Sequence, residues 1–414
     1  MVSRMDKPLT PPSIRSLSAS LTPAARRLFE SARTEATRLN LELWAVGGTV
    51  RDAVVGRQPA DVDVAVRSDA AALARAVGAS VGGAYSLEER FGTASITLED
   101  DRLDLATLRA ERYSAPGALP TVALGVAVEE DLRRRDFNVN SVALSLTGAG
   151  AGVVLDPFGG LNDLAAGRFH VLHDRSFEDD ATRLWRAARL SVQRDLRPSR
   201  PTRNLIVEGA NWLDTISGDR LWSEFALIAD RGRAGRTLAL LDQWGVLEAT
   251  NRALPLRPTA QAALRHRWRP LAAAQLAAVV LGSREPASAA EALRRLSAPT
   301  VASRTVEGTQ ALLAASDADP DRLEALTATS EEARRAARWL DATQAELQLA
   351  LRRWERTRPP LTAAELLRMG VPEGPTVGRL LRCLRRGRYL GTLGTVGDAR
   401  SLVRQHLERD EGAA

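Results

Sequence analysis

The pattern of apolar residues divides the chain into two parts. Between about residues 40 and 172, short apolar runs alternate with polar residues or stand between glycine, proline and aspartate clusters, which is typical of strands in a mixed α/β region. The predicted strands are Leu43–Val46, Val62–Val66, Ala94–Leu98, Leu103–Ala106, Val139–Leu146 and Val153–Leu155. Helical spacing predicts helices at Pro23–Leu39, Asp69–Val77 and Glu129–Arg134. Thr22 is a suitable N-cap for the first of them.

Beyond about Phe177 the strand signals vanish, and Ala, Leu and Arg dominate at helical spacing to the C-terminus. The first segment, Met1–Leu21, is rich in Pro, Ser and Thr, and we predict a loose tail there. The expected fold class is therefore α+β, with an N-terminal α/β head built on a small mixed sheet and an all-α remainder.

Length and composition narrow the class of protein. A chain of 414 residues is too long for one hydrophobic core, so two to four domains are expected. No run of about 18 apolar residues and no N-terminal apolar segment occur, so neither a membrane span nor a secretory signal is expected. The single cysteine, Cys383, excludes an internal disulfide framework and a cysteine-cluster zinc site. These features predict a cytoplasmic protein.

The charge favours a polyanionic partner. The net charge is +6, and all 57 basic residues except Lys7 are arginine. Arginine binds phosphate through two parallel hydrogen bonds and stacks on bases. A GC-rich genome would also replace lysine by arginine, but it would not by itself explain the basic excess.

The strongest chemical signal is an aspartate pair that follows a glycine turn. Gly47-Gly48-Thr49-Val50-Arg51-Asp52 reads as a tight turn opening a short helix, Thr49–Val55, after the first strand. Because strand side chains alternate, Asp61 and Asp63 should share one face while Val62 enters the core. Glycine lets the backbone approach phosphate, and Mg2+ prefers hard carboxylate and phosphate oxygens. We therefore expect a magnesium and nucleotide triphosphate site.

A third carboxylate, Asp104, lies in the next predicted strand. Three carboxylates from neighbouring strands can hold two metal ions, one that activates an attacking hydroxyl and one that stabilises the leaving pyrophosphate. In this interpretation Asp61, Asp63 and Asp104 are catalytic, Asp61 and Asp63 are the metal ligands, and Gly48 and Arg51 contact the triphosphate.

Two further segments carry candidate binding residues. In the first, an arginine triplet is followed directly by a predicted apolar strand, in the run Arg133-Arg134-Arg135-Asp136-Phe137-Asn138-Val139-Asn140. There Arg135 could contact phosphate or ribose, and Asn140 could contact a sugar hydroxyl. The segment Phe177–Arg189 is predicted to open a helix with Asp180, Arg183, Arg186 and Arg189 three residues apart. These residues could form a chain of helical ion pairs, or a carboxylate and guanidinium set that pairs with a base edge.

Taken in order, these motifs resemble the bacterial-type (class II) tRNA nucleotidyltransferase and poly(A) polymerase family. The matching motifs are Gly-Gly-x-Val-Arg-Asp, Asp-x-Asp, Arg-Arg-Asp-Phe-x-x-Asn, Asp-Pro-x-x-Gly-x-x-Asp-Leu at 156–164 and the Asp-x-x-Arg helix, with later similarity at 218–224 and 369–378. The resemblance covers about residues 40 to 405.

The resemblance implies head, neck, body and tail domains and the addition of CTP and ATP to the 3′ end of tRNA without a template. The implied division is a tail at 1–21, a catalytic head at 22–175, a neck at 176–235, a helical body at 236–320 and a tRNA-binding tail at 321–414. It further implies two Mg2+ ions on Asp61 and Asp63. The implied nucleotide contacts are Gly48, Arg51, Arg135, Asn140, Asp180, Arg183, Arg186 and Arg189, of which Asp180 and Arg183 would pair with the base.

The chain departs from the family pattern in ways that leave the added nucleotides open. Asp179-Asp180-Ala181 stands where Glu-Asp-Pro is usual, Asn138 and Ser141 replace a usual Thr and Ala, and Ala118-Leu119 occupies a loop position that is basic in many full CCA-adding members. An A-only or CC-only tRNA enzyme and a bacterial poly(A) polymerase therefore remain alternatives.

Two readings from other classes fit less well. In a non-catalytic RNA-binding protein on the same scaffold, the metal carboxylates would be expected to decay first, and all three are present. A metal phosphohydrolase site at His173-Asp174 is disfavoured because the chain has only four histidines.

Overall fold

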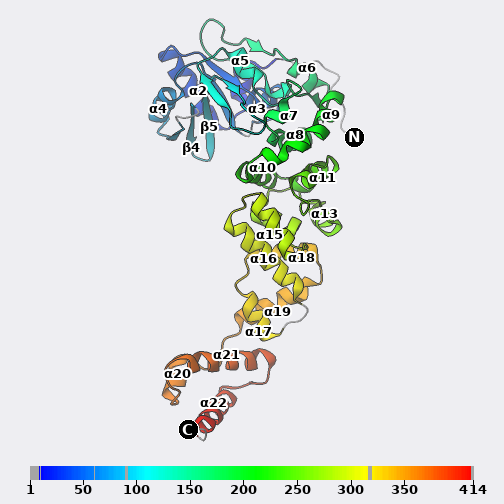
Figure 1. Cartoon of the computed structure of the whole chain (residues 1–414). Coiled ribbons are helices and arrows are strands. Elements are labelled where there is room, and N and C mark those ends of the chain that lie inside the picture. The colour runs from blue at the N-terminus through cyan, green and yellow to red at the C-terminus, as the bar shows by residue number, and fades with distance from the viewer. Residues whose placement is uncertain (1–8, 10, 60, 89–91, 316–318, 412–414) are drawn as a thin grey trace. The chain divides into compact units, whose positions relative to one another are not determined.

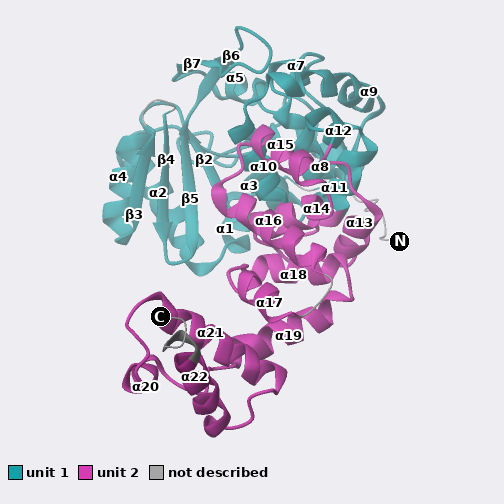
Figure 2. Cartoon of the chain, turned by 60° about the horizontal axis from the view of Figure 1, so that its bottom comes forward, with its two compact units in different colours: residues 1–228, 236–252 teal, residues 229–235, 253–414 magenta. Residues whose placement is uncertain are grey.

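The computed structural model describes the chain except for residues 1–8, 10, 60, 89–91, 316–318 and 412–414. It divides into two compact units (Figure 2), one formed by residues 1–228 and 236–252 and the other by residues 229–235 and 253–414. The first unit holds the sheet and the second is helical (Figure 1), so the structure confirms the predicted α+β class.

A seven-stranded sheet forms the centre of the first unit, with strand order β3-β4-β5-β2-β1-β8-β9. Its strands are β1 (Leu43–Val46), β2 (Val62–Val66), β3 (Ala84–Glu88), β4 (Thr93–Leu98), β5 (Asp101–Thr107), β8 (Ala143–Ser145) and β9 (Val154–Leu155). Strands β2 and β5 run parallel, and the other neighbours are antiparallel, so the sheet is mixed as predicted. Two small ribbons pair β6 (Arg109–Arg112) with β7 (Thr121–Leu124) and β10 (Arg168–Phe169) with β11 (Arg197–Pro198).

Helices cover both faces of the sheet. The helices of the sheet region are α1 (Ile14–Ser20), α2 (Pro23–Arg38), α3 (Gly48–Val54), α4 (Ala70–Val81), α5 (Val128–Arg133), the 3-10 turn η2 (Asn138–Asn140) and α6 (Gly160–Ala165). On one face α2 and α4 pack against alternate strand residues such as Leu43 and Val64 (Figure 1). On the other face Trp44 and Ala65 pack with Leu132 of α5. This alternation decides which side chains of β1 and β2 remain available for a site.

The helices that follow the sheet region in the chain are α7 (Ser176–Asp179), α8 (Thr182–Arg194), α9 (Arg200–Gly209), η3 (Ala210–Thr215), α10 (Gly218–Asp230), α11 (Ala234–Gln243) and α12 (Val246–Thr250). The remaining helices are α13 (Pro258–Leu264), α14 (Ala273–Leu281), α15 (Pro286–Arg295), α16 (Thr300–Ala314), α17 (Pro320–Leu326), α18 (Glu331–Leu340), α19 (Gln344–Arg356), α20 (Ala363–Arg368), α21 (Pro375–Leu390) and α22 (Val396–Glu411). No described helix is both long and apolar enough to cross a membrane.

The prediction of a loose tail over Met1–Leu21 is wrong for its second half. Residues Ile14–Ser20 form helix α1, which begins with a capping box between Ser13 and Ser16. Leu17 is fully buried and belongs to the same core cluster as α2. The serines that suggested a tail serve instead to cap a helix that this leucine anchors.

Two predicted elements are broken where polar side chains bond locally. The strand predicted over Val139–Leu146 starts only at Ala143, because the Asn138 amide donates to Asp163 at 2.8 Å and the Ser141 hydroxyl to the Phe137 carbonyl at 3.0 Å, which holds the η2 turn. The helix predicted from Phe177 onward is interrupted at Asp180, which is extended with φ −150°. Strand β3 was not predicted, since its residues are mostly exposed and carry no apolar alternation.

Candidate active site

The turn between β1 and α3 requires glycine. Gly47 has φ +65°, and a Cβ placed on it would lie 2.8 Å from a guanidinium nitrogen of Arg135. One step further, the Thr49 hydroxyl accepts from the backbone N–H of Asp63 at 2.7 Å and donates to the carbonyl of Asp61 at 3.2 Å. The first turn of α3 is thereby joined to the start of β2, where Asp61 directly precedes the strand and Asp63 is its second residue.

Asp61 and Asp63 reach the same hollow. Val62 is buried in the core shared with α2 and α4, so the alternation along β2 turns both aspartates to the opposite face. Both line a hollow of about 690 Å3 within the first unit. The hollow is also lined by most of the other residues predicted from sequence, namely Gly48, Arg51, Arg135, Asn140, Asp180, Arg183, Arg186 and Arg189.

Asp104 lies beside the pair without lining the hollow. It is the direct neighbour of Asp63 across the parallel β2–β5 pairing. Its carboxylate is held by Arg102 at 2.8 Å and by a short hydrogen bond from the Ser95 hydroxyl. Within the described part of the chain, no three acidic, histidine or cysteine side chains converge closely enough to form a ready metal site.

The position of Asp63 disfavours its own negative charge. Burial, together with the nearby carboxylates of Asp104 and Asp61, raises the pKa of Asp63 to about 6, although Arg135 and Arg51 act to lower it. Such a site gains from a bound cation, and two carboxylates with substrate phosphates form the donor set that Mg2+ prefers. Asp61 and Asp63 therefore fit a divalent metal.

Buried acids fix the arginines on one wall. Asp131, on α5, accepts from Arg134 at 2.6 Å and from Arg135 at 2.8 Å. Burial opposes its ionisation, but the two guanidinium groups hold the pKa of Asp131 below its usual value. On the facing side Arg51 donates to the side-chain oxygen of Asn140. These contacts set the directions of Arg135 and Arg51, the two arginines proposed to bind the triphosphate, before any ligand binds.

A further group of lining residues comes from α8 and from Asp180, two residues before the helix begins. The Asp180 carboxylate accepts from the Thr182 backbone N–H at 2.9 Å, which starts α8. Arg183 donates to the Ser176 hydroxyl at 2.6 Å and to the Arg134 carbonyl at 3.0 Å. Asp180 thus lies at the helix N-terminus instead of on its flank, yet it still faces the hollow together with Arg183.

Arg186 and Arg189 are anchored to carboxylates. Arg186 pairs with Asp136 at 2.8 Å and Arg189 with Glu224 at 2.6 Å. Although burial disfavours its charge, Asp136 has a pKa below its usual value because Arg186 and the Asn140 amide stabilise the carboxylate. The partner of Asp136 is thus Arg186, which comes from a distant part of the sequence.

Several residues that line the hollow were not among the site residues predicted from the sequence. They are Arg109, Glu111, Tyr113, Leu119, Pro120, Val122 and Arg220. Most belong to the β6–β7 ribbon or its loop, whose short strands have no strong pattern. Burial and the neighbouring Glu111 raise the pKa of Tyr113 to about 12, so its phenol stays protonated. Arg220 pairs with Asp180 at 2.7 Å, a contact that only the folded chain reveals.

The fold and this site together define a nucleotidyltransferase. Residues 43–170 match the family model described as the poly A polymerase head domain. The chain is 33% identical over 380 residues to a CC-adding tRNA nucleotidyltransferase of Deinococcus radiodurans, covering 88% of this chain and 90% of that protein. The chain therefore belongs to the tRNA nucleotidyltransferase and poly(A) polymerase family. Enzymes of this class generally use divalent metal ions.

Other similarities cover less of the chain or show the fold alone. An A-adding tRNA nucleotidyltransferase of Geobacter sulfurreducens is 37% identical over 223 residues, which is 53% of this chain and 25% of that protein. Among solved structures, a Thermotoga maritima CCA-adding enzyme complexed with tRNA matches with a TM-score of 0.70 at 22% identity, over 95% of this chain and 98% of that one.

Proposed function

We propose that the protein transfers CMP, AMP or both from CTP and ATP to the 3′ end of tRNA, without a nucleic-acid template and with release of pyrophosphate. The observation that carries the proposal is that one hollow is lined by Asp61 and Asp63, by the arginines Arg51 and Arg135, and by Asp180 and Arg183. The nearly full-length similarity to a CC-adding enzyme supports the same reaction.

In the proposed site, the carboxylates of Asp61 and Asp63 bind two Mg2+ ions. When bound, the metal would lower the pKa of the attacking 3′ hydroxyl and stabilise the leaving pyrophosphate. Asp104, next to Asp63, would add negative charge at the same end of the hollow. Gly48 would allow close approach of the triphosphate, and Arg51 and Arg135 would bind its oxygens.

The base would be read by Asp180 and Arg183, with Arg186 and Arg189 as support. One oxygen of the Asp180 carboxylate, Oδ1, already accepts from the Thr182 N–H, the Thr182 hydroxyl and Arg220. This leaves Oδ2 to accept from an exocyclic amine of the base, while the guanidinium of Arg183 donates to a ring nitrogen or carbonyl. Cytosine and adenine both carry such an amine, and uracil does not.

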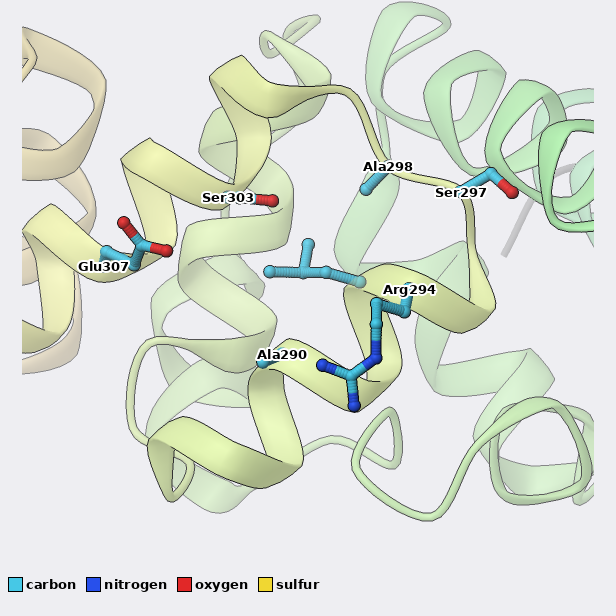
Figure 3. A pocket seen from close by; sticks show the side chains of 7 residues that line it. Ala290, Arg294, Ser297, Ala298, Ser303 and Glu307 are labelled. Atoms are coloured by element: carbon cyan, nitrogen blue, oxygen red, sulfur yellow. The ribbon is translucent and has the colours of Figure 1, made fainter.

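The tRNA would be held in part by the helical second unit. A hollow between α19 and α21 is lined by Arg352, Arg353, Arg356, Arg358 and Arg388, all exposed, and by no carboxylate. In contrast, the hollow between α15 and α16 combines Arg294 with Glu307 (Figure 3), so its charges offset each other. The arginine-rich hollow, which we call the α19–α21 cluster, suits RNA phosphates.

We further propose the division into head, neck, body and tail at residues 175, 235 and 320, and action in the cytoplasm, where tRNA and nucleotides are available.

The test of the reaction is an extension assay on three tRNA substrates, ending at the discriminator base, at the first C and at the second C, with CTP or ATP alone. We expect CMP incorporation on the first two, because the relative that matches nearly the whole chain is a CC-adding enzyme. AMP incorporation on the third would favour the A-adding alternative, which the 37% identity to an A-adding enzyme supports. No incorporation of either nucleotide on any substrate would contradict the proposed function.

A further inference from the structure

A buried carboxylate joins two arginines from distant parts of the first unit. Asp52, on α3, is 2% exposed. Its Oδ1 accepts from the Nε of Arg51 and of Arg194, both at 2.9 Å. Its Oδ2 accepts from the Nη2 of Arg51 at 3.0 Å and of Arg194 at 2.7 Å. Each guanidinium therefore binds the same carboxylate through two parallel hydrogen bonds, which is the most direction-dependent form of ion pair.

The two arginines come from different elements, and only Arg51 belongs to the proposed site. Arg51 lines the hollow next to Gly48, where the triphosphate would bind. Arg194 does not line the hollow. It is the last residue of α8, the helix whose opposite end carries Arg183. Asp52 therefore connects the phosphate end of the site with the base-reading helix, although neither Asp52 nor Arg194 lines the space where a nucleotide would lie.

The length of α8 makes this connection consequential. Its 13 residues span roughly 20 Å. A helix behaves as a stiff rod over this length, so its direction is set by where its two ends are held. Near its start, α8 is held by the bonds of Arg183 and by the Arg186–Asp136 pair. At its other end, α8 is held by the bonds of Arg194 to Asp52, at 2.7 and 2.9 Å, and by the longer bond from the exposed Arg57 to the Gln193 carbonyl at 3.4 Å. Loss of the bonds to Asp52 would let α8 tilt and would move its base-reading end.

We propose that Asp52 and Arg194 are positioning residues that align the base-reading helix with the triphosphate-binding arginine, and so set nucleotide selection. The inference rests on the proposed function. It assigns to Arg194 a role in discrimination between nucleotides that its place outside the hollow would not suggest. Asp52 sets the direction of Arg51, which would bind the triphosphate, and it also holds Arg194 at the end of the base-reading helix. Phosphate binding and base reading would therefore depend on the same carboxylate.

The test is Arg194→Gln in the full chain, with kcat and KM measured separately for the preferred nucleotide and for UTP on the same tRNA. We expect the preference for the cognate nucleotide over UTP, as a ratio of kcat/KM, to fall by about tenfold, with a raised KM for the cognate nucleotide. Affinity for tRNA should not change. Arg194→Lys keeps the charge without the two-pronged geometry, and its preference should lie between wild type and Gln.

Arg57→Ala is the matched control, because the exposed Arg57 side chain donates to the Gln193 carbonyl at 3.4 Å, next to Arg194. Arg57 meets Asp52 only through its backbone N–H, which donates to the Asp52 carbonyl at 2.9 Å and is kept in the alanine variant. It should retain wild-type discrimination. Equal losses of kcat for every nucleotide in Arg194→Gln, with the preference intact, would reduce the ion pair to a purely structural role and overturn the proposal. If the Gln variant does not fold, the Lys variant decides by the same ratio. A wild-type protein that incorporates no nucleotide would instead refute the proposed function, before any variant is compared.

Discussion

The arginines that line the two hollows are held in different ways. Around the hollow of the first unit, Arg135, Arg186 and Arg189 each pair with a carboxylate at 2.6 to 2.8 Å. In the α19–α21 cluster of the second unit, none of the five arginines pairs with a carboxylate within the described part of the chain, although Arg353 donates to the Tyr389 carbonyl at 3.0 Å. Paired arginines have fixed directions and suit the selection of one ligand over another. Unpaired, exposed arginines suit a phosphate backbone that must be attracted without being read.

The largest effect is expected when the proposed metal ligand Asp61 is removed. Asp61→Ala should lower nucleotide incorporation by at least about a thousandfold, because transition-state charge would lose its metal support. The tRNA dissociation constant should stay within about twofold, since the α19–α21 cluster is untouched. The measurement pairs an extension assay with fluorescence anisotropy. Asp100→Ala, an exposed aspartate in the turn between β4 and β5, is the control. Substantial turnover by Asp61→Ala would count against the metal assignment.

The second test breaks base reading while keeping phosphate binding. Arg183→Ala should reduce discrimination between the cognate nucleotide and UTP or GTP by about 10- to 100-fold, since a good guanidinium–base contact contributes roughly 1–3 kcal/mol. The cognate turnover should fall less than the discrimination does. Competition assays with mixed nucleotides give both numbers. Arg175→Ala, which removes an exposed arginine paired with Glu178, should leave the preference unchanged. An unaltered preference in Arg183→Ala would defeat the base-reading assignment.

The third test uses the raised pKa of Asp63. The pKa of this carboxyl is 3.8 in the unfolded chain and about 6 in the folded, metal-free protein. Because the folded state holds the proton more tightly, the free energy of unfolding falls as the pH rises from about 4 to above 6. Asp63→Asn should therefore stabilise the metal-free protein by about 2 to 3 kcal/mol at pH 7.5, and by little at pH 4. Urea unfolding with EDTA measures this difference. Equal effects of the substitution at both pH values would show that Asp63 does not carry an unfavourable charge.

The smallest expected effect concerns the second unit. The double substitution Arg352→Gln and Arg356→Gln should weaken tRNA binding by about 3- to 10-fold and reduce the salt dependence of the binding constant by about one to two units of slope. At saturating tRNA, kcat should not change.

Arg335→Gln with Arg338→Gln removes the same charge from α18, where both arginines share Glu331 at 3.7 Å, and it should weaken binding less. Equal losses in the two double variants would mean that the overall charge, and not the α19–α21 cluster, holds the RNA.

The sequence alone determined the fold class and the main chemical motifs. Strands Leu43–Val46 and Val62–Val66 are observed with the predicted bounds, because buried strands with glycine turns and alternating faces carry a strong local pattern. The same alternation predicted that Asp61 and Asp63 share a face. Edge strand β3 and the β6–β7 ribbon escaped prediction, since exposed strands bury few apolar residues and leave little pattern.

Only the tertiary structure decided which charges pair. Asp136 meets Arg186 fifty residues later, and Asp52 meets Arg194 across 142 residues. Local spacing cannot predict such pairs, because they depend on how α8 packs on the sheet region. The tertiary structure also decided that Asp104 is held by Arg102 and Ser95 outside the hollow. Local patterns arise from short-range backbone geometry and burial, whereas ion pairs between distant segments exist only after packing has brought those segments together.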